Sequence, residues 1–294
     1  MPRFIGLIGY PLRHSVSPYF QQAALDYYQL DIRYQAWETP PETLESRVKA
    51  LRKRENIGAN VTLPYKQKVL PLLDWCDETS SLIGAVNTVV NDSGKLLGFN
   101  TDAAGFIKAL KEQGHFDPEG KRVVVLGAGG AARAVTFALL QNRVSSLIIL
   151  NRTFERAKAL VDALNEYGRN CVTLAGKNRT EVLALPWEAL TSAETFHDCH
   201  LIVNCTTIGM KHDQEESPLR REVIPKGVLV YDLVYNPRPT MLLRLAQEAG
   251  ASILDGLPML VYQGAASFEL WTKKRAPIEL MLKVAEEALK GGEW

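Results

Sequence analysis

The sequence predicts a two-domain α/β protein, and three observations support this fold class. The chain has 294 residues, and chains of this length usually divide into more than one domain, each with its own hydrophobic core. Apolar runs of strand length alternate with amphipathic helical segments along the whole chain, which is the pattern of βαβ units. Near the middle, a helical segment gives way to the turn-rich stretch FDPEGK, residues 116–121, close to which we expect the first half to end.

The first half predicts a mixed sheet covered by helices. Its order of strand, helix, strand, helix, strand is a βαβαβ beginning. Two later strands flank Asp92, Ser93 and Gly94, a hairpin signal that adds an antiparallel pair. We expect strands at residues 4–10, 32–39 and 57–63 and two more within 84–102, with helices at residues 18–30, 43–54, 66–75 and 103–114.

The second half predicts a doubly wound parallel sheet. A valine-rich strand and a helix fill residues 121–140, and residues 145–168 repeat that order. Further strands are expected at residues 200–206 and 227–235, and further helices at residues 240–250, 257–272 and 277–290.

Composition favours small-molecule partners. The 34 basic and 33 acidic residues give a formal net charge of +1, which provides no electrostatic footprint for nucleic acid or an anionic membrane. The four cysteines form no CxxC pair, the N-terminus shows no targeting pattern, and no apolar run approaches the roughly 20 residues of a membrane helix. We therefore expect a cytoplasmic protein with reduced thiols, as a monomer or a homodimer.

A glycine-rich turn predicts a Rossmann-like dinucleotide site. Gly127, Gly129 and Ala132 fit G-x-G-x-x-A, directly after a strand and at the start of a helix. Gly127 permits a tight turn, Gly129 lets the backbone approach a pyrophosphate, and Ala132 allows the helix to pack closely on the strand. An ordinary turn between strand and helix is the alternative.

The end of the next strand favours NADP over NAD. An NAD site places a carboxylate there for the ribose hydroxyls, whereas this sequence has Asn151, Arg152 and Thr153. A guanidinium can make paired, charge-assisted hydrogen bonds to a 2′-phosphate, and Arg156 adds another charge one helical turn later. The alternative is that both arginines are solvated residues at a helix start and that Thr153 is an N-cap.

Several polar residues mark candidate chemistry in the first half. In NVTLPYK, Pro64 ends a strand and should turn Lys66 outward at the carboxyl end of the sheet. Ser15 and Ser17 alternate in a loop, which in an extended segment would place them on one side. Simpler interpretations exist: Ser17 as a helix cap, Asn87 as a strand-end amide, and Asp102 as the N-cap of the helix that follows it.

The order of these motifs resembles that of the shikimate dehydrogenase family over almost the whole chain. The matching strings are HS-x-SP with Ser15 and Ser17, NVT-x-P-x-K ending at Lys66, GAVNT with Asn87, G-x-NTD-x-x-G ending at Gly105, GAGGAAR, NRT, YN-P-x-x-T and QGA-x-x-F. Each string is weak alone. Their shared order makes coincidence a poor explanation.

The resemblance implies a role for each matching residue. Lys66 and Asp102 would form the catalytic pair, and the substrate would contact them together with Ser15, Ser17, Thr62, Asn87, Tyr235 and Gln263. NADP would bind Gly127, Ala128, Gly129, Gly130, Ala131, Asn151, Arg152, Thr153 and Arg156, with Gly256 and Met259 near the nicotinamide. Residues 1–104, rejoined by 258–294, would form the substrate-binding and catalytic domain, and residues 105–257 the NADP-binding domain.

The reaction implied is the reversible, NADP-dependent reduction of 3-dehydroshikimate to shikimate, in which the lysine and aspartate handle the proton. Two alternatives remain open. One is a shikimate or quinate dehydrogenase that uses NAD, against which Arg152 argues. The other is a non-catalytic NADP-binding sensor, which would not need Lys66 and Asp102. No His, Cys or carboxylate spacing predicts a metal site.

Overall fold

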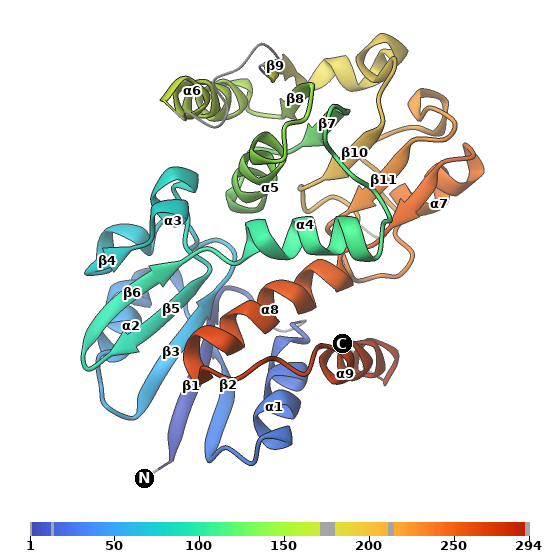
Figure 1. Ribbon diagram of the computed structural model, residues 1–294. Helices are drawn as coiled ribbons and strands as arrows, with labels where there is room; N and C mark the ends of the chain where they lie inside the picture. The colour runs from blue at the N-terminus through green and yellow to red at the C-terminus, as the bar shows by residue number, and fades with distance from the viewer. Residues whose placement is uncertain (1, 13–14, 171–179, 211–214, 292–294) are drawn as a thin grey trace. The chain divides into compact units, whose positions relative to one another are not determined.

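The computed structural model describes residues 2–12, 15–170, 180–210 and 215–291, and the chain divides into two compact units (Figure 1). The first unit comprises Met1–Gly105 and Leu260–Trp294, and the second comprises Phe106–Met259. None of the helices in these described ranges is long and apolar enough to cross a membrane.

The first unit is built on the predicted mixed sheet. Its six strands lie in the order β2-β1-β3-β5-β6-β4, with β1 parallel to β2 and β3, and β5 antiparallel to β3 and β6. The strands are β1 (Arg3–Gly9), β2 (Ile32–Glu38), β3 (Asn56–Val61), β4 (Trp75–Cys76), β5 (Thr88–Asp92) and β6 (Lys95–Phe99). The helices are α1 (Ser17–Tyr27), α2 (Leu44–Ala50), α3 (Glu78–Ile83), α8 (Leu257–Thr272) and α9 (Ile278–Gly291). The first residues of α8 belong to the second unit.

Strand β3 shows how its two faces are used. Ala59 and Val61 are buried in one core with residues of α2. Gly58 and Asn60, which alternate with these two residues, point to the opposite face. There, a Cβ on Gly58 would lie 2.5 Å from Nε1 of Trp271, so glycine lets α8 approach the sheet. Asn60 points to that same α8 side, which places a polar group beneath the helix.

The hairpin between β5 and β6 is confirmed. Ser93 and Gly94 have φ values of 54° and 93°, the positive values that a two-residue hairpin turn requires. The helix predicted at residues 66–75 is wrong. That segment holds only a 3₁₀ turn, Leu70–Leu72, before β4 begins. Pro71 explains the difference, because it lacks an N–H and disfavours a helical conformation at the residue before it.

The second unit has the predicted doubly wound sheet. All six strands are parallel, in the order β12-β11-β10-β7-β8-β9, which in chain order from the β9 edge reads 3-2-1-4-5-6. The strands are β7 (Arg122–Leu126), β8 (Ser146–Asn151), β9 (Glu181–Pro186), β10 (Leu201–Asn204), β11 (Leu229–Asp232) and β12 (Ser252–Leu254). The helices are α4 (Asp102–Glu112), whose first residues belong to the first unit, α5 (Gly130–Gln141), α6 (Phe154–Asn170) and α7 (Met241–Glu248).

The strand order creates a switch point between β7 and β10. The chain moves from β7 outward to β8 and β9, and then returns to β10 on the other side of β7. Loops that leave these two strands diverge, and ligands of such sheets bind in the crevice between them. Residues Val123 to Leu126 are fully buried, as expected for a central parallel strand covered on both faces.

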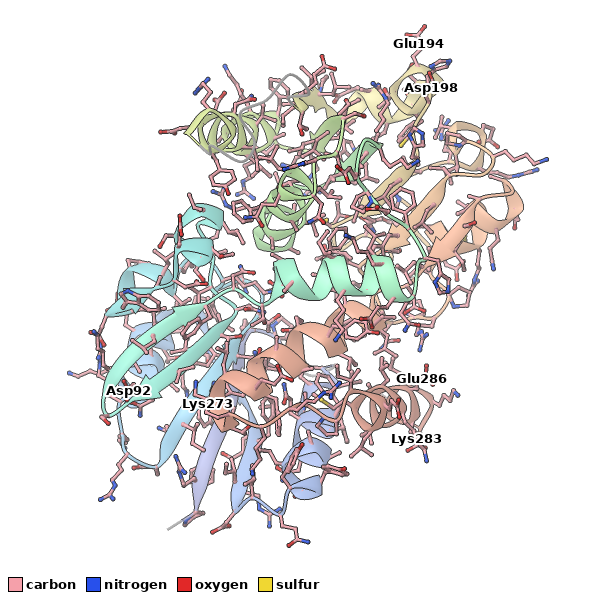
Figure 2. The ribbon with its side chains drawn as sticks, in the orientation of Figure 1. Asp92, Glu194, Asp198, Lys273, Lys283 and Glu286 are labelled. Carbon is pink, nitrogen blue, oxygen red and sulfur yellow. The ribbon has the colours of Figure 1, made fainter. Side chains whose placement is uncertain are left out.

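Charged side chains of both signs lie on the surface of the first unit. Asp92, Lys273, Lys283 and Glu286 are all exposed, and Figure 2 shows them projecting from the hairpin, the end of α8 and α9. This mixture agrees with the nearly balanced composition.

Candidate active site

Lys66 stands on a turn whose backbone is held from several sides. After β3, the N–H of Thr62 donates to the carbonyl of Ile8, and the carbonyl of Lys66 accepts from the N–H of Val86 at 2.7 Å. Tyr65 is fully buried and its hydroxyl donates to the carbonyl of Thr39. Burial raises the pKa of Tyr65, so this anchor remains a neutral donor. The buried side chain of Tyr65 therefore anchors the turn. The amine of Lys66 is not needed for this and can bond to a group outside the turn.

Asp102 is not the cap of α4. The side-chain oxygen of Asn100 accepts the N–H groups of Asp102 and Ala103, at 3.1 and 3.4 Å. That amide therefore supplies the side-chain cap at the start of the helix. The alternative interpretation of Asp102 as an N-cap is wrong, because its carboxylate has other partners.

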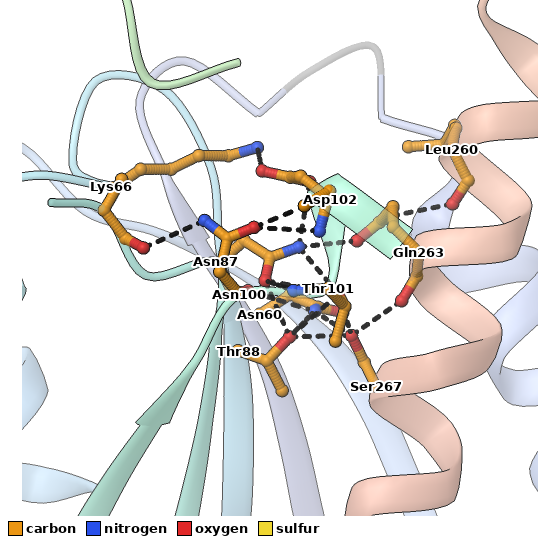
Figure 3. Close-up of polar contacts among 12 residues, drawn as sticks. Asn60, Lys66, Asn87, Thr88, Asn100, Thr101, Asp102, Leu260, Gln263 and Ser267 are labelled. Atoms are coloured by element: carbon orange, nitrogen blue, oxygen red, sulfur yellow. Dashed lines mark hydrogen bonds and ion pairs between the residues drawn. The ribbon is translucent and has the colours of Figure 1, made fainter. Parts of the chain in front are cut away.

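The structure brings Lys66 and Asp102 together. Nζ of Lys66 lies 2.7 Å from Oδ2 of Asp102, and Asn87 donates through Nδ2 to the other carboxylate oxygen at 2.9 Å (Figure 3). The side chains of Lys66 and Asp102 are only 16% and 3% exposed. Both carboxylate oxygens thus hold an N–H donor in a largely buried setting, where charge-assisted hydrogen bonds are strong.

The orientation of the Asn87 amide is fixed. Its Oδ1 accepts the backbone N–H of Thr101 at 2.8 Å, and a backbone N–H can only donate. Nδ2 must therefore face Asp102 and Oε1 of Gln263, which lies 3.0 Å away. Gln263 in turn donates to the carbonyl of Leu260 at 2.7 Å. Asn87 consequently joins a residue of α8 to the carboxylate.

A glycine allows α8 to reach this position. A Cβ on Gly105 would lie 2.7 Å from the backbone nitrogen of Gln263, closer than real Cβ atoms approach. The first turn of α4 and the second turn of α8 therefore touch through backbone. This contact explains the glycine that ends the string G-x-NTD-x-x-G.

The two serines lie at the start of α1, in an arrangement that differs from the prediction. Val16 between them has φ −86° and ψ −4°, so the segment is not extended and the alternation argument is wrong. Ser17 is the first helical residue rather than the cap, and its N–H donates to the hydroxyl of Ser15 at 3.3 Å. Ser17 is buried and Ser15 half-buried. Thr62 lies beside the end of β1, because a Cβ on Gly9 would come within 2.4 Å of its methyl group.

In the second unit, the glycine turn lies at the switch point of the sheet. Gly127 has φ +110°, which favours glycine, and its N–H donates to the carbonyl of Leu150 at 2.7 Å. A Cβ on Gly127 would lie 3.2 Å from the carbonyl of Cys205, which follows β10. Gly129 precedes α5, and no heavy atom lies within 4 Å of a Cβ built on it. This open helix N-terminus fits the pyrophosphate of a dinucleotide.

The remaining residues of the turn and the neighbouring strand end can be placed. Ala128 is buried, and Gly130 and Ala131 form the first turn of α5. At the end of β8, Nδ2 of Asn151 donates to the carbonyl of Thr153 at 2.8 Å, which closes a small loop. Arg152 and Arg156 are exposed, and neither pairs with a carboxylate among the residues that the structure describes. Their guanidinium groups are free of any such competitor for a phosphate.

Three further predicted residues belong to loops at the carboxyl edge of this sheet or to the start of α8. Gly256 lies against the loop after β11, since a Cβ there would approach the carbonyl oxygen of Leu233 to 2.1 Å. Met259 is buried in the first turn of α8. Tyr235 is half-buried in the loop after β11.

Sequence reasoning missed Asp232. This fully buried carboxylate at the end of β11 accepts from Nδ2 of Asn204 at 2.9 Å, from the N–H of Val234 at 3.0 Å and from the hydroxyl of Thr240 at 2.7 Å. Burial raises its pKa to about 6, against the effect of these three donors. The signal available was an aspartate at the end of an apolar strand.

The fold and these sites define a class of protein, an α/β protein that combines a dinucleotide-binding unit with a buried amine and carboxylate pair suited to proton transfer. Comparison with known proteins narrows the class. Residues 7–89 match the shikimate dehydrogenase substrate binding domain, residues 109–181 match shikimate / quinate 5-dehydrogenase, and residues 256–286 match the shikimate 5′-dehydrogenase C-terminal domain.

Individual relatives are similar over nearly their whole length. Shikimate dehydrogenase (NADP(+)) of Methanopyrus kandleri is 42% identical over 97% of this chain and 96% of its own. The crystal structure of shikimate 5-dehydrogenase from Thermus thermophilus, in complex with NADP(H) and shikimate, is 39% identical, covers 98% of this chain and 100% of that one, and has a TM-score of 0.84. Quinate dehydrogenase from Corynebacterium glutamicum, in complex with NAD, is 29% identical, covers 97% and 99%, and has a TM-score of 0.85. The chain belongs to the shikimate dehydrogenase family.

Proposed function

We propose that this protein catalyses the reversible, NADP-dependent reduction of 3-dehydroshikimate to shikimate. The observation that carries the proposal is the ion pair of Lys66 and Asp102 at 2.7 Å. Asn87 donates to the second carboxylate oxygen of Asp102. Family membership supplies the substrate, and the arginines after β8 support NADP.

Lys66 is the proposed proton donor. As the ketone at C3 is reduced, its oxygen gains negative charge and needs a proton. NADPH supplies the hydride to the carbonyl carbon. The ammonium group of Lys66 transfers one proton to the oxygen, and in the reverse direction the neutral amine takes it back. Asp102 orients the amine and accepts from a substrate hydroxyl.

The polar residues around the pair are the proposed substrate contacts. A triol acid requires several neutral donors and acceptors, because an unpaired buried group costs on the order of 1 to 3 kcal/mol. Asn87 and Gln263 already lie within hydrogen-bond distance of each other beside Asp102. We assign the carboxylate of shikimate to Ser15 and Ser17, and the ring and its substituents to Thr62, Asn87, Tyr235 and Gln263.

The second unit is the proposed cofactor domain. We assign the pyrophosphate to the turn at Gly127–Ala131 and the 2′-phosphate to Asn151–Thr153 and Arg156, with Gly256 and Met259 near the nicotinamide. The open N-terminus of α5 supports the first assignment, and the second is supported by guanidinium groups that pair with no carboxylate in the described ranges. By the same reasoning, the first unit is the substrate-binding and proton-transfer domain. We further propose a cytoplasmic monomer or homodimer whose partners are these small molecules.

The direct test is an absorbance assay at the band of reduced nicotinamide. Purified protein is mixed with shikimate or quinate and with NADP or NAD. We expect reduction of the cofactor with shikimate and NADP, and much slower reduction with the other three combinations. No reduction with any pair would contradict the proposal.

A second candidate is quinate oxidation with NAD, because the solved quinate dehydrogenase of this fold is in complex with NAD. Quinate differs from shikimate in being saturated and carrying one more hydroxyl, so the same polar contacts could serve it. A higher kcat/KM for quinate with NAD in the same assay would favour this candidate.

A further inference from the structure

A fully buried serine lies on α8 behind the candidate site. Oγ of Ser267 lies 2.7 Å from the hydroxyl of Thr88 and 3.1 Å from that of Thr101. It also lies 3.0 Å from Nδ2 of Asn60 and 2.9 Å from the carbonyl of Gln263 (Figure 3). We propose that Ser267 is a positioning residue, which acts through Asn87 and Gln263 on the substrate site and on the carboxylate of Asp102.

Groups that can only donate or only accept fix the direction of the Asn60 hydrogen bonds in this network. Nδ2 of Asn60 lies 3.2 Å from the carbonyl of Asn87, which can only accept. Oδ1 of Asn60 must then accept from the hydroxyl of Tyr34 at 2.8 Å. Burial raises the pKa of Tyr34, which keeps that hydroxyl a donor. Ser267 therefore receives an N–H from Asn60.

The hydroxyl of Ser267 has one hydrogen and two lone pairs to divide among its partners. Its hydrogen goes to the carbonyl of Gln263, and one lone pair accepts from Asn60. The other lone pair faces the hydroxyl of Thr88, the nearer of the two threonine hydroxyls, whose single hydrogen is shared between Ser267 at 2.7 Å and Oδ1 of Asn87 at 3.1 Å. The hydroxyl of Thr101 is then directed to Oδ1 of Asn87 at 3.2 Å.

This assignment connects Ser267 to the substrate site in two ways. Oδ1 of Asn87 receives both the N–H and the hydroxyl of Thr101, which keeps Nδ2 directed at Asp102. A reversed amide would face the carboxylate with an oxygen. Ser267 also ties α8 to β3 and β5 one helical turn after Gln263, so that Oε1 of Gln263 stays within 3.0 Å of Asn87. All of these residues belong to the first unit.

The variant Ser267→Ala tests the proposal, which rests on the proposed function. Loss of one junction of a buried network should lower kcat/KM for shikimate by about five- to twentyfold. The KM for NADP should stay within about twofold, because the proposed cofactor contacts lie in the other unit. A protein that is inactive in its wild-type form would refute the proposed function, whereas an active wild type with an unaffected Ser267→Ala variant would refute this inference alone.

Thr272→Ala is the matched control. Thr272 lies on the same helix, and its hydroxyl also donates to a carbonyl four residues earlier, that of Phe268 at 2.8 Å. Within the described part of the chain, its hydroxyl makes no hydrogen bond to a member of the network. This control should leave kcat/KM for shikimate within about twofold of wild type. Equal effects of the two alanine variants would overturn the proposal. If Ser267→Ala does not fold, Thr88→Val removes the shortest link of the same junction and is judged by the same outcomes.

A double-variant cycle separates positioning from general destabilisation. In the background of Asn87→Ala, the further change Ser267→Ala should lower kcat/KM by a smaller factor than it does in wild type, because Asn87, one of the two residues through which it acts, is gone. Its effect on the melting temperature should persist in both backgrounds. An equal loss of kcat/KM with and without Asn87 would overturn the proposal.

Discussion

The candidate sites of the two units differ in composition: the first is made of side chains, and the second mainly of backbone. In the first unit, the buried side chain of Asn87 and the largely buried side chain of Lys66 both contact the carboxylate of Asp102, from which they are 15 and 36 residues distant in sequence. In the second, the site is an open turn of backbone, Gly127 to Gly130, followed by exposed arginines. A buried network fixes geometry but tolerates little change. On the proposed function, we therefore expect reactivity to depend on the first unit, and cofactor preference to be alterable at the surface of the second.

The largest expected effect comes from Lys66→Met. Removal of the amine should lower kcat by about a hundred- to ten-thousandfold, the range that general acid–base catalysis provides. Shikimate affinity, measured by calorimetry, should fall far less, because the other polar contacts remain. The comparison is Lys68→Met, an exposed lysine two residues further on, which should retain normal kcat. Near-normal turnover of Lys66→Met would remove the amine from the mechanism.

The next largest effect concerns stability in the second unit. The pKa of Asp232 is about 6 in the folded protein, above its ordinary 3.8, so the folded state binds this proton more tightly than the unfolded state. The stabilisation from this group is present below about pH 4 and is lost as the pH rises through about 6. Asp255, which pairs with Arg238, adds repulsion.

The variant Asp232→Asn should reveal this cost. Its unfolding free energy relative to wild type should increase by about 2 to 3 kcal/mol between pH 4 and pH 7. Denaturant titrations of both proteins across this range give the difference directly, and contributions common to both proteins cancel. A difference that does not change with pH would show that the carboxylate is not held in this way.

A somewhat smaller effect is expected at the cofactor site. Arg152→Ala should raise the KM for NADP about tenfold or more, the value of a lost charge-assisted hydrogen bond, and should barely change the KM for NAD. Arg169→Ala is the control, because Arg169 is an exposed arginine in the last turn of α6, the helix that follows Arg152. If both cofactors are affected equally, Arg152 does not contact a 2′-phosphate.

Two glycine variants within one turn separate an effect on stability from an effect on cofactor binding. Gly127→Ala forces a side chain onto φ +110° and should destabilise the protein by about 1 to 3 kcal/mol. Gly129 has φ −84°, and the space around a Cβ built on it is open. The variant Gly129→Ala should therefore change stability by less than about 0.5 kcal/mol and lower the affinity for NADP. Melting temperature and cofactor titration distinguish the two. Unchanged NADP affinity in Gly129→Ala would contradict the pyrophosphate assignment.

Strong periodic patterns allowed much of the fold to be predicted. The valine-rich strand before Gly127 and the hairpin turn at Ser93 and Gly94 have the structures expected of them, because each depends on local sequence. The helix predicted at residues 66–75 does not form, because Pro71 disfavours a helix there despite the apolar pattern. The short strands β4 and β12, of two and three residues, are too brief to leave a periodic signal.

The candidate site was only partly predictable, for a related reason. Lys66 and Asp102 could be singled out because each belongs to a recognisable string, NVT-x-P-x-K and G-x-NTD-x-x-G. The capping role of Asn100 and the junction at Ser267 could not, because each depends on which groups meet in space. Ser267 lies within an apolar helix and resembles any small helical residue in the sequence. Buried polar contacts between distant segments carry no local pattern.

The central claim is that Lys66 and Asp102 act as one unit, and the kcat of the double variant Lys66→Met with Asp102→Asn tests it most directly. Residues that function together are not additive, so the account predicts a kcat close to that of the slower single variant. A double variant whose loss equals the product of the two single losses would contradict it, since the amine and the carboxylate would then act independently.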